Sequence, residues 1–181
     1  MTTDSRAHGI AAQHFRDLMA GVCAPVTVVT TTDDTIPYGA TVSSFASLSA
    51  EPPLVTIALD RRSTVLAHIR GAGRFGVNLL GHAQSDLATL FARRGAERFA
   101  EAAWHLDHGL PRLAGAAGWI VCSVHNVVAG GDHELIIGHV EAASRTELPP
   151  LIYAHRTFGT HSHYHHRPRA LIVDQIAACA H

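Results

Sequence analysis

The chain has 181 residues, of which 47 % are apolar, and its 14 basic side chains nearly balance 15 acidic ones. This length suits one domain with a substantial core, so we expect a single domain over residues 1–181. The charge balance argues against an electrostatic nucleic-acid binder, and the sequence predicts neither a membrane span nor a signal peptide.

The first half of the chain predicts one helix followed mainly by strands. Phe15, Leu18 and Val22 follow helical spacing and indicate an amphipathic helix over residues 11–22. β-Branched segments come next, and two consecutive prolines mark the entrance of a strand. We expect the following elements in chain order: strands at 25–32, 38–44 and 54–60, a helix from Ser63 or Thr64 to about Arg70, and a strand at 74–80.

The second half predicts one more helix and then long strands. Leu87, Leu90 and Phe91 indicate a helix over about 83–93, whereas residues 95–116, rich in Gly and Ala, look irregular. Two long antiparallel strands follow at 118–131 and 132–143, joined at Gly130-Gly131, with a short last strand at 150–155. Strands outnumber helices without a regular βαβ alternation. The sequence therefore predicts a mainly β fold with helices (α+β), an antiparallel sheet or barrel.

Gly71, Gly73 and Gly76 form a G-x-G-x-x-G pattern, the spacing of a dinucleotide-binding loop. That loop needs a strand before the glycines and a helix after them, so that a pyrophosphate meets a helix N-terminus. Here a predicted helix comes first, and Phe75 and Val77 alternate as a strand afterwards. We interpret the pattern as a helix stop and a tight turn.

Five hydroxyl side chains lie close together between two predicted strands: Thr41, Ser43, Ser44, Ser47 and Ser49. A strand end offers free backbone N–H groups, and neighbouring hydroxyls add neutral donors that can hold a phosphate or a ribityl chain. The alternative is an ordinary polar loop whose hydroxyls satisfy the local backbone. The segment alone leaves both interpretations open.

A second polar segment follows the next strand. Arg61 and Arg62 precede Ser63 and Thr64 at a predicted helix start, and a helix N-terminus with hydroxyls and a guanidinium is a common anion site. The alternative is simple capping of the helix. Because the two polar segments end strands that are adjacent in sequence, we expect them to lie close in space.

Seven motifs, in this order, carry a family resemblance: FRDLMAGVxxPVTVVT, YGATVSSFxSLSxxPPLV, ST, RFGVNLL, ERF, GLPRLxGA and GDHxLxxGxV. They span about residues 12–160 and leave a C-terminal tail at 161–181. The sequence resembles the flavin reductase-like family with an FMN-binding split barrel. Within it, the chain is most similar to the small NAD(P)H:flavin oxidoreductases that serve two-component monooxygenases.

The resemblance implies a split antiparallel β-barrel that forms a homodimer, with flavin at the dimer interface. It implies that the first polar segment wraps the ribityl and phosphate part of FAD or FMN and that the second holds the phosphate from the other side. The flavin-binding residues expected on this basis are Tyr38, Gly39, Ala40, Thr41, Val42, Ser43, Ser44, Asp60, Arg61, Ser63, Thr64, Arg98 and Phe99.

The resemblance also implies a nicotinamide site and a partner. His133, in the GDH motif, is expected to contact and orient NADH as the catalytic residue, although a turn histidine paired with Asp132 would look the same in sequence. Tyr153, His155 and Arg156 match a segment that faces the same substrate. The implied reaction is hydride transfer from NAD(P)H to flavin, which then serves a monooxygenase, and we expect NADH in preference to NADPH. The reason is that the sequence shows no basic cluster that could bind the 2′-phosphate of NADPH.

Two further features bear on competing functions. Cys23, Cys122 and Cys179 are odd in number and far apart, which favours a reduced, cytoplasmic setting, with Cys122 in the core. Histidines gather at 161–166, but without a zinc-hydrolase motif we expect no metal. The alternatives to a reductase are a non-catalytic flavin- or haem-binding split-barrel protein and, more weakly, a metal-binding module on this tail.

Overall fold

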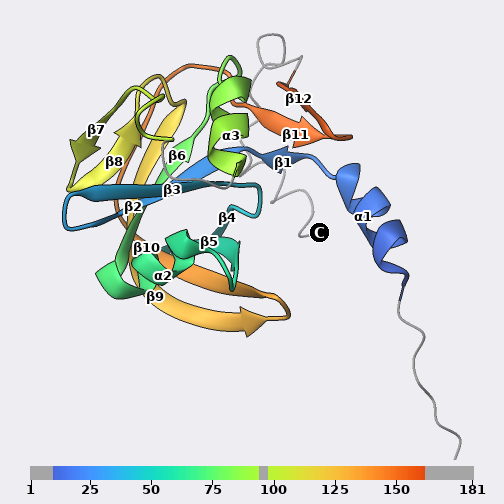
Figure 1. The fold of residues 1–181 in the computed structure, drawn as a ribbon, viewed down its shortest axis with the longest axis horizontal. Coiled ribbons are helices and arrows are strands. Elements are labelled where there is room, and N and C mark those ends of the chain that lie inside the picture. Colours follow the sequence, from blue (N-terminus) through green and yellow to red (C-terminus); the bar gives the residue numbers. More distant parts are fainter. Residues whose placement is uncertain (1–9, 94–97, 162–181) are drawn as a thin grey trace, which may run out of the picture.

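A computed structural model of the chain describes residues 10–93 and 98–161, and one antiparallel sheet of seven strands dominates it (Figure 1). The strand order is β3-β2-β6-β9-β10-β5-β4, and every neighbouring pair is antiparallel. The strands have these bounds: β2 Thr27–Asp33, β3 Ile36–Val42, β4 Ala46–Ala50, β5 Pro53–Asp60, β6 Arg74–Leu79, β9 Gly118–Gly130 and β10 His133–Arg145.

Two small sheets and three helices surround the large sheet (Figure 1). Short strands near the two ends of the described chain pair with each other, and a hairpin forms the third sheet. Their bounds are β1 Ala24–Pro25, β11 Ile152–Ala154 and β12 Thr157–Gly159 in one sheet, and β7 Trp104–Asp107 and β8 Leu110–Leu113 in the other. The helices are α1 Ala12–Ala20, α2 Thr64–Ala72 and α3 Ser85–Ala92. Among these described helices, none has both the length and the apolarity to cross a membrane.

The mainly β, antiparallel character predicted from sequence is confirmed, but the predicted barrel is not closed. β3 and β4 are the two edges of the large sheet, and within the described residues no ladder joins them. A side chain bridges this gap instead. Ser44, just after β3, donates its hydroxyl to the Ala58 carbonyl of β5 at 3.0 Å and accepts from the Ala58 N–H at 2.8 Å.

The predicted helices and long strands are confirmed within a few residues, whereas the prediction of an irregular segment at 95–116 was wrong. The β7–β8 hairpin lies there, turning at His108 and Gly109 with φ of 52° and 76°. Two other short strands, β4 and β12, were also missed. Each of these strands has five residues or fewer, too few for the alternation of side chains to stand out in the sequence.

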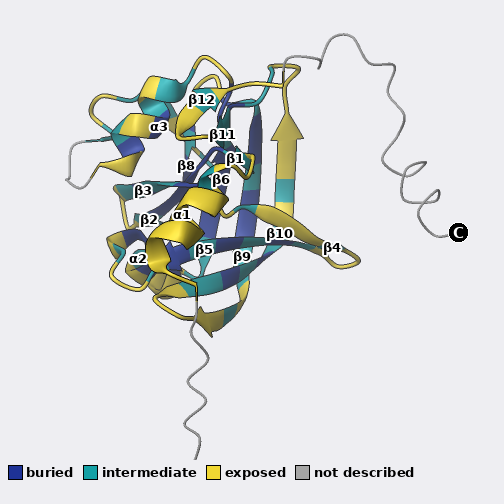
Figure 2. Ribbon diagram, turned by 90° about the vertical axis from the view of Figure 1, so that its right-hand side faces the viewer, coloured by how far each residue is buried: buried dark blue, intermediate teal, exposed yellow. Residues whose placement is uncertain are grey.

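The main core lies inside the curve of the large sheet. Six of its strands supply one apolar cluster that includes Val29, Ile57, Phe75 and Ile136, and α2 covers the cluster with residues such as Ile69. Figure 2 shows this buried interior, with α1 exposed along its length. Strands that curve around one cluster must approach each other at their ends, and this brings distant polar segments together.

Cys122, predicted from sequence as a core residue, is part of this cluster. Its burial, with a smaller contribution from Glu141, raises the pKa of the thiol to about 12. A thiol with this pKa stays protonated and unreactive at neutral pH.

A second apolar cluster occupies the other face of the sheet. It includes Val28 of β2, Leu80, Phe91 of α3 and Leu151. Val28 and Val29 are adjacent and belong to different clusters, as the two-residue period of a strand requires. Helix α3 therefore packs against β2 and β3 on the face opposite the main core. This places it next to the first polar segment, which starts within β3.

The G-x-G-x-x-G pattern has the structural role predicted for it. Gly73 ends α2 in the left-handed region at φ 66°, and Gly76 lies within β6. A Cβ built on Gly76 would lie 2.1 Å from the Trp119 ring and 2.9 Å from the hydroxyl of Thr30. The glycines thus serve a helix end and a close packing contact.

We expect Gly76→Ala to lower the free energy of unfolding by about 2 kcal/mol or more, because buried Trp119 must move to admit the methyl group. Urea unfolding followed by fluorescence measures this. Gly71→Ala is the matched control. Nothing lies within 4 Å of its added Cβ, so it should leave stability unchanged or raise it by up to about 1 kcal/mol. Equal stability of the two variants would contradict the packing role.

Candidate flavin site

A pocket of about 800 Å³ opens between β3, the end of β5, the start of α2 and the segment after α3. The end of β5 and the start of α2 adjoin each other, but β3 and the segment after α3 come from other parts of the sequence. The pocket confirms only that the two polar segments lie close in space. Most of the residues predicted for flavin line it: Tyr38, Gly39, Ala40, Thr41, Asp60, Ser63, Thr64, Arg98 and Phe99. Whether they bind flavin stays a prediction.

Four of the predicted residues do not line this pocket. Val42 is buried in the main core, Ser43 is exposed, and Arg61 is exposed with its main-chain N–H donated to the Asp132 carbonyl at 3.0 Å. Ser44 makes the bridge to Ala58 already described. The side chain of Ser44 thus does what the alternative interpretation of the polar segment required, which is to satisfy the backbone.

Thr41 lines the pocket, but its hydroxyl hydrogen is also committed. It donates to the Ala88 carbonyl in α3 at 2.7 Å. Ser63 is different, because it stands at the N-cap of α2 without making a side-chain cap bond. The first N–H groups of α2 and the Ser63 hydroxyl therefore remain available to an anion in the pocket.

Arg98 is the cation best placed to meet such an anion. Its Nη1 donates to the Gly39 carbonyl at 2.6 Å and to the Phe91 carbonyl at 3.4 Å, which fixes the guanidinium against the pocket wall. Its Nε is buried and has no partner within the described residues. Burial lowers the pKa of Arg98 below its ordinary value. A bound phosphate would offset this desolvation, so the residues present fit a flavin phosphate.

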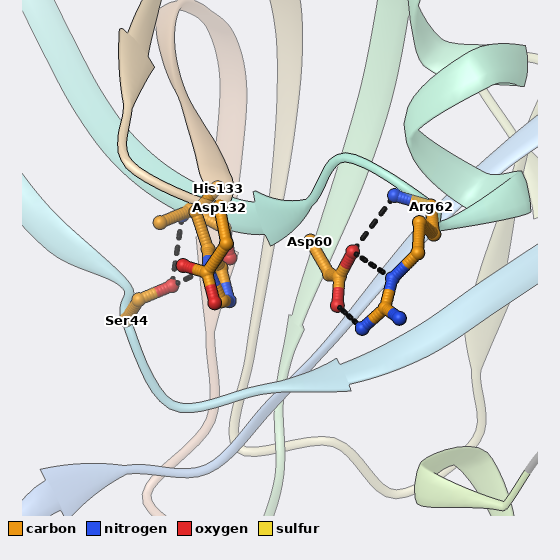
Figure 3. Close-up of polar contacts among 6 residues, drawn as sticks. Ser44, Asp60, Arg62, Asp132 and His133 are labelled. Carbon is orange, nitrogen blue, oxygen red and sulfur yellow. Dashed lines mark hydrogen bonds and ion pairs between the residues drawn. The ribbon is translucent and has the colours of Figure 1, made fainter. Parts of the chain in front are cut away.

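Asp60 and Arg62 form a closed pair at the pocket edge (Figure 3). The Arg62 guanidinium donates to both carboxylate oxygens at 3.2 and 3.0 Å, and the Arg62 main-chain N–H donates to Oδ1 at 2.8 Å. These bonds lower the pKa of Asp60 to about 2. The pair is complete above the ordinary carboxyl range and is lost only as the pH falls through about 2. Asp60 therefore presents little free negative charge to an anion.

Arg61 was among the residues predicted from sequence, but of these two neighbouring arginines it is Arg62 that lines the pocket. A usable signal was present. An aspartate often accepts a hydrogen bond from the N–H two residues later, and Asp60 and Arg62 have this spacing. Arg93 and His68 also line the pocket and were missed. They stand on segments whose orientation depends on how α2 and α3 pack on the sheet.

His133 begins β10 and lies directly across the ladder from Asp60 (Figure 3). Its Nδ1 donates to Asp132 at 2.8 Å, and this bond lowers the pKa of Asp132. The imidazole is 46 % exposed, and within the described residues its Nε2 has no hydrogen bond. The β5–β10 pairing thus brings the GDH motif to the edge of the pocket with one ring nitrogen free.

The other predicted nicotinamide residues lie elsewhere in the chain. Tyr153, His155 and Arg156 belong to the β11–β12 hairpin, where Tyr153 packs on Phe158 and Arg156 pairs with Asp17 of α1. His155 lines a second pocket of about 380 Å³. Within one chain, the structure does not bring these three residues to the first pocket.

The histidine-rich tail falls largely outside the described residues, which include only His161 of that group. In the part of the chain that is described, no three metal-ligating side chains gather closely enough to hold a metal ion.

The sequence profile described as flavin reductase like domain matches residues 19–162. This chain belongs to the flavin reductase-like family. It is 39 % identical over 146 residues to the reductase component of a 4-nitrophenol 4-monooxygenase/4-nitrocatechol 2-monooxygenase from Rhodococcus opacus, covering 80 % of this chain and 78 % of that one. It is 36 % identical over 131 residues, 71 % of this chain, to the reductase component of a flavin-dependent trigonelline monooxygenase from Acinetobacter baylyi, of which it spans 42 %.

Among solved structures, the fold is similar to the NADH:FAD oxidoreductase SgcE6 of Streptomyces globisporus, whose structure is a complex with NAD and FAD fragments. The TM-score is 0.81 and the identity 28 %, over 84 % of this chain and 94 % of that one. The resemblance inferred from the motifs is confirmed. The chain is an oxidoreductase of the flavin reductase type.

We expect Ser44→Ala, but not Ser43→Ala, to lower the stability of the protein. Ser44→Ala removes two hydrogen bonds to Ala58 and should lower the free energy of unfolding by about 1 kcal/mol. Ser43→Ala is the matched control, because Ser43 is exposed and does not line the pocket; it should leave stability within about 0.5 kcal/mol and flavin affinity unchanged. Urea unfolding and flavin titration of both variants measure these effects. A Ser44→Ala variant as stable as the wild type would contradict the bridging role.

Proposed function

We propose that this flavin reductase transfers hydride from NADH to FAD or FMN as a substrate and supplies the reduced flavin to a partner monooxygenase. The observation that carries the proposal is the first pocket, where the polar ends of β3 and β5, the uncapped start of α2 and Arg98 converge. The cytoplasmic location and the single domain predicted from sequence remain predictions.

The phosphate of the flavin is assigned to Ser63, Thr64 and Arg98. Ser63 and the first N–H groups of α2 offer neutral donors, and Arg98 offers a guanidinium already fixed by two carbonyls. The Asp60–Arg62 pair closes the same end of the pocket without adding free negative charge. These donors suit an anion such as a phosphate, which several hydrogen bonds of moderate strength would hold together with one guanidinium.

The chemistry is the transfer of a hydride, which is one proton with two electrons, from C4 of the nicotinamide to N5 of the flavin ring, with a second proton taken up from solvent. The protein must hold the two rings in contact and exclude other poses. His133 is assigned to the nicotinamide nucleotide, because Asp132 fixes one nitrogen of its ring and leaves the other free. A non-catalytic flavin-binding protein would need no nicotinamide contact, so that alternative does not account for the free ring nitrogen of His133.

The test is direct. Purified protein mixed with NADH and free FAD or FMN should oxidise NADH, followed as loss of the nicotinamide absorbance band under limited oxygen. His133→Ala should raise the KM for NADH by about tenfold, the loss expected for one hydrogen bond to a charged ligand, and change flavin affinity less than twofold.

His125→Ala is the matched control, because His125 is an exposed histidine on β9 that does not line the pocket. It should keep the wild-type KM. Full turnover of His133→Ala at low NADH would overturn the role of His133. The absence of any NADH oxidation by the wild type would overturn the reductase itself and leave flavin storage as the function to pursue.

We also propose that the protein works as a homodimer. Helix α1 has no buried residue, although Phe15, Leu18 and Met19 are apolar and 51, 62 and 46 % exposed (Figure 2). An apolar helix face of this kind is typical of a protein interface. A second protomer would also account for Tyr153, His155 and Arg156, whose predicted nicotinamide contact cannot be made at the first pocket of their own chain.

Leu18→Asp should shift the protein from dimer to monomer, because a carboxylate would then have to be buried in the interface. Light scattering after size exclusion measures the mass. Leu106→Asp is the control, since Leu106 is 57 % exposed on the separate β7–β8 hairpin and should leave the mass unchanged. A wild-type protein that is monomeric, or a Leu18→Asp variant that stays dimeric, would rule out α1 as the interface.

A further inference from the structure

Two stacked rings line the first pocket, and of the two only Tyr38 was among the residues predicted to bind flavin. The ring of Tyr38 lies parallel to that of His68, with centroids 3.6 Å apart and an interplanar angle of 19°. Both residues line the pocket. His68 Nδ1 lies 3.2 Å from a carboxylate oxygen of Asp33, which fixes the orientation of the imidazole and hence of the stack.

The stack lies beyond the phosphate-binding residues. Thr64 and His68 are four residues apart in α2, so they share one helix face, with His68 about 6 Å further from the N-terminus. Strand β3 lines the pocket from Thr41 back to Ile36, a length of about 17 Å at the usual rise per residue. The pocket therefore continues beyond the residues assigned to the phosphate, in the direction away from Asp60 and His133.

The far part of the pocket has the chemistry of a purine nucleotide site. The stacked Tyr38 and His68 offer an aromatic surface to a planar base. Arg93, which follows α3, lines the same pocket as Arg98, is exposed, and forms no ion pair within the described residues. A second guanidinium in one pocket suits a diphosphate better than a single terminal phosphate.

We propose that the Tyr38–His68 stack holds the adenine of FAD and makes the enzyme prefer FAD to FMN, with Arg93 on the second phosphate. This specificity rests on the proposed reductase function and deepens it. FMN ends at the phosphate and leaves the far part of the pocket to water. FAD fills it and gains the base stacking that FMN lacks.

The experiment compares FAD and FMN affinities, by flavin fluorescence titration, for the wild type and four variants. The wild type should bind FAD about tenfold more tightly than FMN, the size of one base–aromatic stack. Tyr38→Leu should lose most of this preference and keep its FMN affinity within twofold. Tyr38→Phe keeps the ring and should keep the preference.

His68→Gln tests the other ring and also covers the case in which Tyr38→Leu fails to fold, because Tyr38 packs partly against the main core whereas the His68 side chain is 27 % exposed. It should reduce FAD affinity several-fold with FMN affinity unchanged. His125→Gln, outside the pocket, should match the wild type.

Three outcomes would overturn the inference. Equal wild-type affinities for FAD and FMN would do so while leaving flavin reduction, measured in the same samples with NADH, intact. Unchanged FAD affinity with a raised KM for NADH in Tyr38→Leu and His68→Gln would assign the stack to the adenine of the nicotinamide nucleotide instead. A wild type that reduces neither flavin would remove the proposed function together with this inference.

Discussion

The antiparallel register of β5 and β10 is the constraint on which the rest of the site depends. It sets Asp60, the last residue of β5, opposite His133, the first residue of β10. The Arg61 N–H to Asp132 carbonyl bond then continues the contact one step past the ladder. Because α2 starts at Thr64, only four residues after Asp60, the same register also fixes where the N-terminus of α2 lies. A shift of one residue would turn every side chain of β5 to the opposite face and take Asp60 out of the pocket.

The pocket carries net positive charge although some of its charged side chains are paired with each other. Asp60 is neutralised by Arg62, and Asp132 is paired with His133. Arg98 is partly desolvated, which lowers its pKa but leaves a guanidinium charged at any physiological pH. The remaining donors are the exposed guanidinium of Arg93, a hydroxyl and main-chain amides. An anion entering the pocket thus gains its strongest interaction from one guanidinium whose position is set in advance by the carbonyls of Gly39 and Phe91.

The sequence predicted the class of fold and the two polar segments because those features are local: alternation, prolines and a helix start. It could not predict which hydroxyls are free, since this depends on contacts made after folding. Ser44 bonds to Ala58 and Thr41 to Ala88, fourteen and forty-seven residues away. For the same reason the sequence could not show that Arg62, and not Arg61, lines the pocket, because the turn after β5 decides which of the two adjacent arginines faces it. Likewise, His68 lies among ordinary helix residues in the sequence, and only the packing of α2 against β3 sets its ring on Tyr38.

The open sheet edge and the small number of anion donors both suit an enzyme that releases its flavin. An enzyme that keeps its flavin through many turnovers gains from a closed barrel and several charged contacts to the phosphate. A reductase that hands its flavin to another protein must release it in every cycle, so each added contact that is equal in the oxidised and reduced states would slow release without speeding the hydride step. Ser44 holds the open edge with one hydroxyl where a ladder of hydrogen bonds would close it. The chain thereby keeps the geometry of the pocket while β3 and β4 stay unpaired with each other within the described residues.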